Sequence, residues 1–319
     1  MRLRSFLFLL VVVTLLSFQS LSAQTAGTGA LTGTVKDPSG AVIPSATVTL
    51  TSIDTGQART TTTASDGSYR FSLLPPGNYK VGIEAGGFKP VQVPSVTIAV
   101  TETEVLDRNL EVGAQAQTVT VESDVVAVQT ENSTLGTVAS SQTVVGLPLN
   151  TRNYTNLLAM SAGVSANVSN ATTIGKGATN MAVNGGATGQ NTYQQDGVTV
   201  NNYMSLGGVT EGTLNGTFAM PNPDAISEFK IQTSSYDAGY GRNPGANVNV
   251  ITRSGTNNFH GSLFEFFRNT SLNANEWFFK KSQGDNGLPN RNPILNSNVY
   301  GGAIGGPIKK DKLFFFVNY

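Results

Sequence analysis

The sequence lacks cysteine altogether, and it has a single histidine, His260, a single tryptophan and only 13% charged residues. Without cysteine the chain has no disulfide, no thiolate metal site and no thiol nucleophile. With one histidine it offers no multi-histidine metal site. It also contains no Gly-x-Ser-x-Gly elbow, no P-loop and no complete dinucleotide fingerprint. We therefore predict that the protein is not an enzyme and uses no cofactor and no bound metal.

A charge bias is absent too, since 20 basic and 20 acidic residues give a formal net charge of +0. Composition therefore gives no support for nucleic-acid binding. Beyond the N-terminus, no apolar run is long enough for a spanning helix, so any membrane segment would be β-structure. At the N-terminus, Arg2 and Arg4 precede the apolar residues 6–16 and a small-residue stretch that ends at Ala23. This pattern predicts a signal peptide over residues 1–23, cleaved after Ala23; an uncleaved anchor is the alternative.

Short runs in which apolar and polar residues alternate dominate the first folded region. Between residues 29 and 112 these runs are separated by turn signals such as residues 37–40, which read Asp-Pro-Ser-Gly, and the Asp66-Gly67 hairpin signal. About seven short strands at this spacing indicate a small β-sandwich. We place its bounds at residues 24–113.

The order GTVKDPSGAVIPSATVTL followed by ASDGSYRFSLLPPGNYKVGIEAGGF resembles the carboxypeptidase regulatory-like domain, a transthyretin-type or immunoglobulin-like β-sandwich. The resemblance implies a non-enzymatic sandwich. Related pilin sandwiches form Lys–Asn isopeptide bonds, and Lys36, Glu84 and Asn109 are the residues that could do so here. We favour the alternative that these three are solvated strand residues, because long charged side chains usually lie outside.

A linker, residues 114–123, follows the sandwich. Within it, polar and apolar residues alternate over residues 118–122. The segment QTVTVES is similar to the TonB box, with which TonB-dependent receptors bind the periplasmic energy protein by strand addition. The candidate docking residues are Thr118, Val119, Thr120, Val121 and Glu122. The same alternation also fits a last strand of the sandwich, and both interpretations stay open.

The next region, residues 124–256, mixes strand signals with one helix signal. A helix is expected over residues 154–160, capped by Thr151 or Asn153. Alternation then predicts strands near residues 181–186, 192–198, 226–231 and 246–252. We expect a small α+β domain.

Five segments of this region resemble the plug domain of TonB-dependent receptors and stand in the family's order. They are LPLNTRNYTNLLAMSAGV, MAVNGG, YQQDGVTVNN, DAISEFKIQTSSYDAGYG and GANVNVITRSGTN. The subgroup with an N-terminal sandwich, called Oar-like, matches best. Asn184 stands where the usual plug signature has an arginine before the glycine. The resemblance implies ligand contacts at the plug apex, for which the candidates are Asn201, Asn202, Tyr203 and Met204.

The last region, residues 257–319, contains three strand signals with many aromatic residues. They cover residues 260–268, 298–304 and 313–319, with a long polar loop predicted over 269–296. The segment GGAIGGPIKKDKLFFFVNY resembles the first barrel hairpin of the Oar-like subgroup. Residues 221–269 would then join the plug to the barrel wall. Because three strands close no barrel, and plugged barrels need about 22, we expect a fragment of a larger product; a buried soluble strand over 313–317 is the alternative.

Together these features predict a mainly β protein: a β-sandwich, a small α+β plug and the first strands of an incomplete transmembrane β-barrel. The expected function is TonB-dependent import of an extracellular ligand across the outer membrane, with plug and sandwich facing the barrel lumen and the periplasm. The partners implied are the TonB complex, outer-membrane lipid and a siderophore, glycan or peptide ligand, with no nucleic acid. The alternative is a secreted or surface adhesion protein that uses the sandwich for carbohydrate binding.

Overall fold

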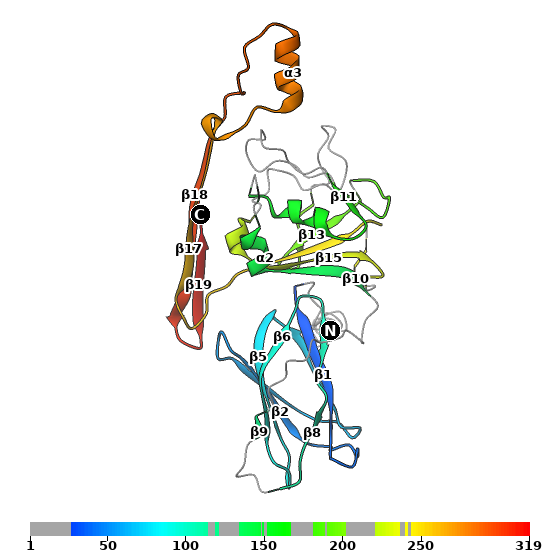
Figure 1. Ribbon diagram of the computed structural model, residues 1–319. Helices are drawn as coiled ribbons and strands as arrows, with labels where there is room; N and C mark the ends of the chain where they lie inside the picture. Colours follow the sequence, from blue (N-terminus) through cyan, green and yellow to red (C-terminus); the bar gives the residue numbers. More distant parts are fainter. Residues whose placement is uncertain are drawn as a thin grey trace, which may run out of the picture.

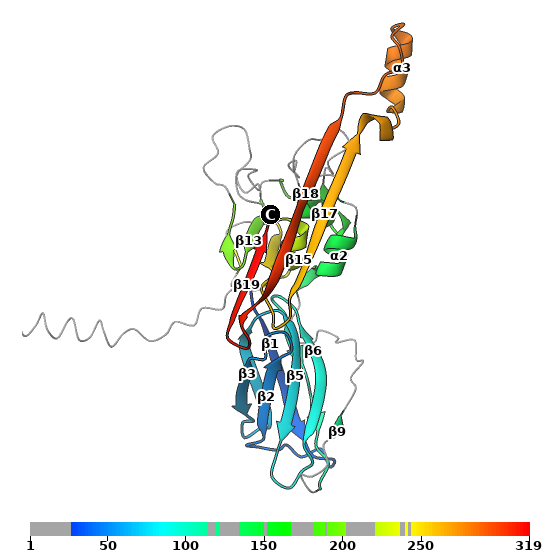
Figure 2. The same cartoon turned by 90° about the vertical axis from the view of Figure 1, so that its left-hand side faces the viewer.

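The computed structural model consists of three β-rich units. It describes residues 27–113, 119–120, 134–147, 149, 152–166, 181–188, 190–201, 221–236, 240–241 and 244–319. The segment predicted to be a signal peptide, residues 1–23 with Ala23 at the expected cleavage site, lies outside these residues. Figure 1 shows the sandwich at one end, a middle unit (described residues of 134–252) above it, and a C-terminal sheet (residues 260–318). In both Figure 1 and Figure 2 the C-terminal sheet runs along the side of the middle unit.

Two sheets packed face to face form the sandwich. The first sheet has the order β4-β1-β7, with β8 also paired to β1; these strands are β1 (Gly29–Lys36), β4 (Ser68–Leu74), β7 (Thr103–Val105) and β8 (Arg108–Asn109). The second has the order β3-β2-β5-β6-β9; these strands are β2 (Thr47–Ser52), β3 (Ala58–Thr62), β5 (Gly77–Glu84), β6 (Val91–Ile98) and β9 (Val119–Thr120). Alternate residues such as Val48, Leu50, Val81 and Ile83 fill the core between the sheets.

One buried hydroxyl ties the entry of β2 to the end of β3. Thr63 Oγ1 donates to the Ile43 carbonyl at 2.7 Å and accepts from the Ala46 N–H at 2.8 Å. The isosteric Thr63→Val leaves both backbone groups without this partner, so we expect the sandwich to lose about 1–3 kcal/mol of unfolding free energy. Urea denaturation measures the loss. The neighbouring Thr62 is exposed, so Thr62→Val should change stability little; equal losses in the two variants would contradict the prediction.

The middle unit is a five-stranded sheet with short helices. Its sheet order is β10-β15-β16-β13-β14. The strands are β10 (Leu135–Ser140), β13 (Thr192–Gln195), β14 (Val198–Thr199), β15 (Ile226–Ser234) and β16 (Asn247–Thr252), and a separate pair is formed by β11 (Val164–Ala166) and β12 (Met181–Val183). The helical segments are α2 (Ser141–Gly146), η1 (Tyr154–Met160) and η2 (Pro223–Ala225). The helix expected over 154–160 is present as a 3-10 helix capped by Asn153, which accepts from Thr155 N–H.

The two faces of this sheet differ in chemistry, because successive side chains of a strand point to opposite sides. One face joins the apolar core of the unit; its residues include Tyr193, Phe229, Ile231, Val248 and Val250. The other face, which we call the polar face, carries four polar side chains that are each at most 2% exposed: Lys230, Gln232, Asn247 and Asn249. A buried polar face requires a covering layer, and the sandwich supplies part of it.

The C-terminal sheet consists of β17 (His260–Asn269), β18 (Asn296–Lys309) and β19 (Leu313–Asn318), joined in that order as two antiparallel pairs. Between β17 and β18 the chain forms η3 (Thr270–Leu272) and α3 (Trp277–Asp285). The long polar loop expected over 269–296 was therefore wrong in part. Helix α3 has no side-chain cap and no buried residue, so few of the usual helix signals mark it. No helix in the described part of the chain has both the length and the apolar character for a bilayer span.

The C-terminal sheet has an exposed apolar side. The register pairs Leu263 with Gly302 and Ile304 with both Gly261 and Val317, so these positions share one face. Its large side chains are exposed: Leu263 at 92%, Ile304 at 54% and Val317 at 59%. On the opposite face Ser262 and Phe264 contact Asp224 and Arg152 of the middle unit, and Ala303 is 8% exposed. The fold class expected from the sequence, mainly β with an N-terminal sandwich and barrel-type strands, is confirmed.

Candidate functional site: the junctions of the middle unit

A buried ion pair lies where the middle unit meets the C-terminal sheet. Arg152, just before η1, pairs with Asp224 in η2, and their side chains are only 5% and 6% exposed. The Arg152 guanidinium also lies over the rings of Phe264 and Phe266, at 4.6 and 4.5 Å from their centroids. Ser262 Oγ donates to Asp224 Oδ1 at 3.1 Å. The first barrel-type strand thus contacts the middle unit through cation–π interactions with Arg152 and a hydrogen bond to Asp224.

A second junction joins the sandwich to the polar face through strand β15. The Val100 N–H donates to Glu228 Oε1 at 2.5 Å. Lys230 Nζ donates to Glu102 Oε1 at 2.9 Å, and the Lys230 side chain is 3% exposed. Burial raises the pKa of Glu228 to about 7, with Glu102 adding to the rise while the Val100 N–H and Lys230 oppose it. The junction therefore contains a carboxyl group that titrates near neutral pH.

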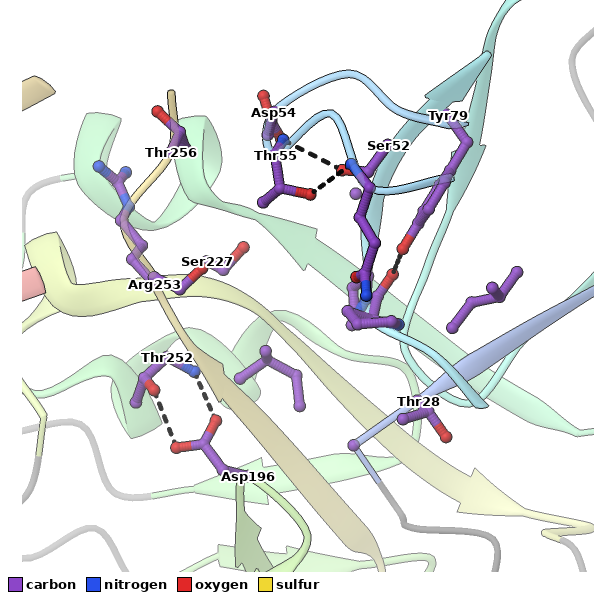
Figure 3. Close-up of a pocket in the computed structure, with 18 of the residues that line it drawn as sticks. Thr28, Ser52, Asp54, Thr55, Tyr79, Asp196, Ser227, Thr252, Arg253 and Thr256 are labelled. Carbon is purple, nitrogen blue, oxygen red and sulfur yellow. Dashed lines mark hydrogen bonds between the residues drawn. The ribbon is translucent and has the colours of Figure 1, made fainter. Parts of the chain in front are cut away.

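A cavity of about 580 Å³ opens where the three units meet. Figure 3 shows its lining, which comes from the sandwich (Ser52, Asp54, Tyr79) and from the middle unit and the chain beyond it (Asp196, Arg253). Asp196 is engaged, since it accepts from Thr252 N–H at 2.9 Å and from Thr252 Oγ1 at 2.8 Å. Asp196 and Gly197 have φ angles of 49° and 82°, which suit the tight Asp-Gly hairpin turn. The described lining contains both acidic and basic side chains, among them Asp54, Asp196 and Arg253. It therefore does not indicate one class of ligand.

The candidate docking segment is partly described. Val119 and Thr120 form β9, which pairs in parallel with Val91 and Gln92 of β6 at the edge of the sandwich. Thr118, Val121 and Glu122 lie outside the described residues. In this arrangement Val119 and Thr120 occupy the place of a last sandwich strand. A docking role would use the same backbone groups, because strand addition also works through main-chain hydrogen bonds.

Of the candidate ligand-contact residues, only Asn201 is described; Asn202, Tyr203 and Met204 lie outside. Asn201 is 8% exposed. Its side-chain oxygen accepts from the Tyr193 N–H at 2.7 Å, and its amide donates to the Asn191 carbonyl at 2.8 Å. This geometry gives Asn201 a structural role in holding β13, and the ligand contacts stay a prediction.

The candidate isopeptide residues are all exposed. Lys36 and Asn109 are register partners on β1 and β8, whereas Glu84 lies on β5 of the other sheet. The arrangement agrees with solvated strand residues. Sequence reasoning missed the residues that make the junctions, Arg152, Asp224, Glu228 and Lys230. Charged residues at alternate positions of β15 read as a solvated face, and only their distant partners reveal that they are buried.

Two family models match parts of the chain. Residues 30–111 match the carboxypeptidase regulatory-like domain, and residues 251–319 match an outer membrane beta barrel domain. The chain thus joins a regulatory-like sandwich to outer-membrane barrel sequence, and the expected outer-membrane location is confirmed by this match. The chain is 27% identical over 283 residues to the TonB-dependent transporter Oar of Myxococcus xanthus. The aligned region covers 85% of this chain and 24% of the relative. The resemblance to Oar-like TonB-dependent proteins is confirmed, and the chain spans about a quarter of that curated transporter.

Two solved structures are similar to the chain at low identity. The outer membrane transporter YddB from Escherichia coli is 15% identical with a TM-score of 0.40, covering 53% of this chain and 24% of that one. The siderophore receptor PirA from Acinetobacter baumannii is 21% identical with a TM-score of 0.41, covering 57% and 24%. The curated relative is a transporter, which agrees with the expectation that the protein is not an enzyme.

Proposed function

We propose that the protein is a TonB-dependent outer-membrane transporter, of which this chain supplies the sandwich, the plug and the first strands of the barrel wall. The observation that carries the proposal is the C-terminal sheet, whose outer face exposes Leu263, Ile304 and Val317 while its inner face holds the middle unit through Arg152 and Asp224. A lipid-facing apolar side with a polar unit inside is the arrangement of a plugged barrel. The middle unit would then be the plug.

In this mechanism an extracellular ligand binds on the outer side of the plug. The TonB complex then draws energy from the inner membrane and pulls on the linker at residues 118–122. The plug rearranges and the ligand passes to the periplasm. The ligand classes that the resemblance allows are siderophore, glycan and peptide. The match of residues 251–319 to barrel sequence favours this function over the alternative of a secreted adhesion protein.

The experiment is uptake in proteoliposomes that carry the protein, with and without the reconstituted TonB complex. A panel of labelled ferric siderophores, oligosaccharides and peptides serves as the probe. We expect at least one probe to enter only when the energised complex is present. Uptake that is the same with and without the complex would contradict the proposal.

The docking segment has its own test. Val119→Pro removes a backbone N–H that strand addition needs, so we expect the affinity for the purified periplasmic domain of TonB to fall about tenfold, or about 1.4 kcal/mol. Calorimetry measures the affinity, and Ala114→Pro, at the start of the same linker, is the matched control. If Val119→Pro lowers the stability of the sandwich and leaves TonB binding unchanged, the segment is a sandwich strand and not a docking site.

A further inference from the structure

The turn between β6 and β7 of the sandwich lies against the polar face of the middle sheet (Figure 1). We call residues 100–102 the latch turn. Its three residues meet three side chains of β15: the Val100 N–H donates to Glu228, Glu102 accepts from Lys230, and Thr101 Oγ1 accepts from Gln232 Nε2 at 3.5 Å. Glu228, Lys230 and Gln232 alternate along the strand and so share one face. The contact is therefore a matched set of three pairs.

The latch turn is shaped by the sandwich itself. Thr101 has a φ of 56°, a conformation that a β-branched residue rarely adopts. It is held there because its N–H donates to the Thr28 carbonyl at 3.1 Å and the Glu102 N–H donates to the Ala99 carbonyl at 3.3 Å. Both bonds lie within the sandwich. The turn is thus a preformed surface feature of the sandwich, which does not need the middle unit in order to form.

The polar face around the latch is incompletely paired. Three of its buried amides, Gln232, Asn247 and Asn249, have side-chain atoms with no hydrogen-bond partner among the described residues: Gln232 Oε1, Asn247 Nδ2, and both Nδ2 and Oδ1 of Asn249. Buried polar groups in a permanent core are nearly always paired. A face lined by amides that the covering layer does not satisfy is better suited to contact with water.

We infer that the sandwich is a detachable cover for the polar face of the middle sheet, fastened by the latch turn through Glu102–Lys230 and Val100–Glu228. When the latch opens, the amides of β15 and β16 become hydrated and the sandwich separates from the middle unit. The linker that carries residues 118–122 lies between these two units in the chain, so tension on it acts on both. That the cover closes the periplasmic side of a plug rests on the proposed function; the latch itself does not.

The absence of cysteine makes a distance measurement straightforward in the full chain. Ser95→Cys on β6 and Val145→Cys on α2 place spin labels at exposed positions of the two units. The unmodified latch should give a single narrow distribution of distances between the labels. Glu102→Lys places a second cation against Lys230, and we expect the distribution to broaden toward longer distances. The charge-swapped pair Glu102→Lys with Lys230→Glu should restore the narrow distribution.

Two further measurements keep the result interpretable. Glu111→Lys breaks another ion pair of the sandwich, with Lys89 at 3.0 Å, away from the latch turn, and should leave the distribution narrow. Hydrogen exchange at the Val100 amide should rise about tenfold or more in Glu102→Lys and not in Glu111→Lys. A broad distribution without any latch mutation would overturn the inference, and so would a narrow one in Glu102→Lys with unchanged Val100 exchange. Neither measurement uses ligand or TonB, so failure here is distinguishable from failure of the transport proposal.

Discussion

Replacing Asp224 with alanine is expected to lower the unfolding free energy of the middle unit by about 3–5 kcal/mol. The reason is the environment of Arg152, whose side chain is 5% exposed and whose guanidinium lies over the rings of Phe264 and Phe266. Without the carboxylate, the guanidinium keeps its charge in a site that excludes water. Ser262 also loses the acceptor of its hydroxyl. The C-terminal sheet should therefore loosen from the middle unit in the same variant.

The measurement is denaturant-induced unfolding of the protein in detergent micelles. The informative control is the double variant Arg152→Met with Asp224→Ala, which removes both charges and retains an apolar side chain against the two rings. It should lose clearly less stability than Asp224→Ala alone, because no unpaired charge remains buried. Equal losses in the single and double variants would show that the charge balance of this pair is unimportant.

Raising the pH from 5 to 8 is expected to weaken the sandwich junction by about 2.5 kcal/mol through Glu228 alone. Burial raises the pKa of Glu228 from its ordinary value of 4.5 to about 7. The folded protein therefore holds this proton more tightly than the unfolded chain does. The stability that the neutral carboxyl contributes is complete below pH 4.5 and is lost as the pH rises through 7. Lys230 and Glu102 are the charged groups that face Glu228.

Urea titrations at pH 5 and pH 8 measure this difference. Glu228→Gln keeps an oxygen that can accept from the Val100 N–H and carries no titratable proton, so the variant should lose most of the pH dependence. It should also be the more stable protein at pH 8. Glu84→Gln changes an exposed glutamate of the sandwich and serves as the control. Identical pH profiles for the wild type and Glu228→Gln would rule out Glu228 as the titrating group.

The local elements were the most predictable part of the protein. The Asp66-Gly67 turn and the alternating runs around it predicted the sandwich strands. In such a strand every second residue is buried, so apolar and polar residues alternate in the sequence. The sequence left Thr151 and Asn153 as candidate helix caps, and Asn153 is the one that accepts from the Thr155 N–H. Helix α2 was less visible, because its Val144 and Val145 favour strands. Ser140 caps this helix and Val144 is buried beneath it, so tertiary packing outweighed local preference.

The sequence by itself determined the kinds of units: a sandwich, a small α+β unit and barrel-type strands, each specified by residues close together in the chain. Only the tertiary structure decided which surfaces of these units meet. Lys230 and Glu102 are 128 residues apart, and Arg152 and Asp224 are 72 apart. The sequence pattern around each residue reflects only its own strand or turn. It therefore gives no sign of which distant residue will be the partner. Their burial follows from how whole units pack together, which is a property of assembled faces and not of any one segment.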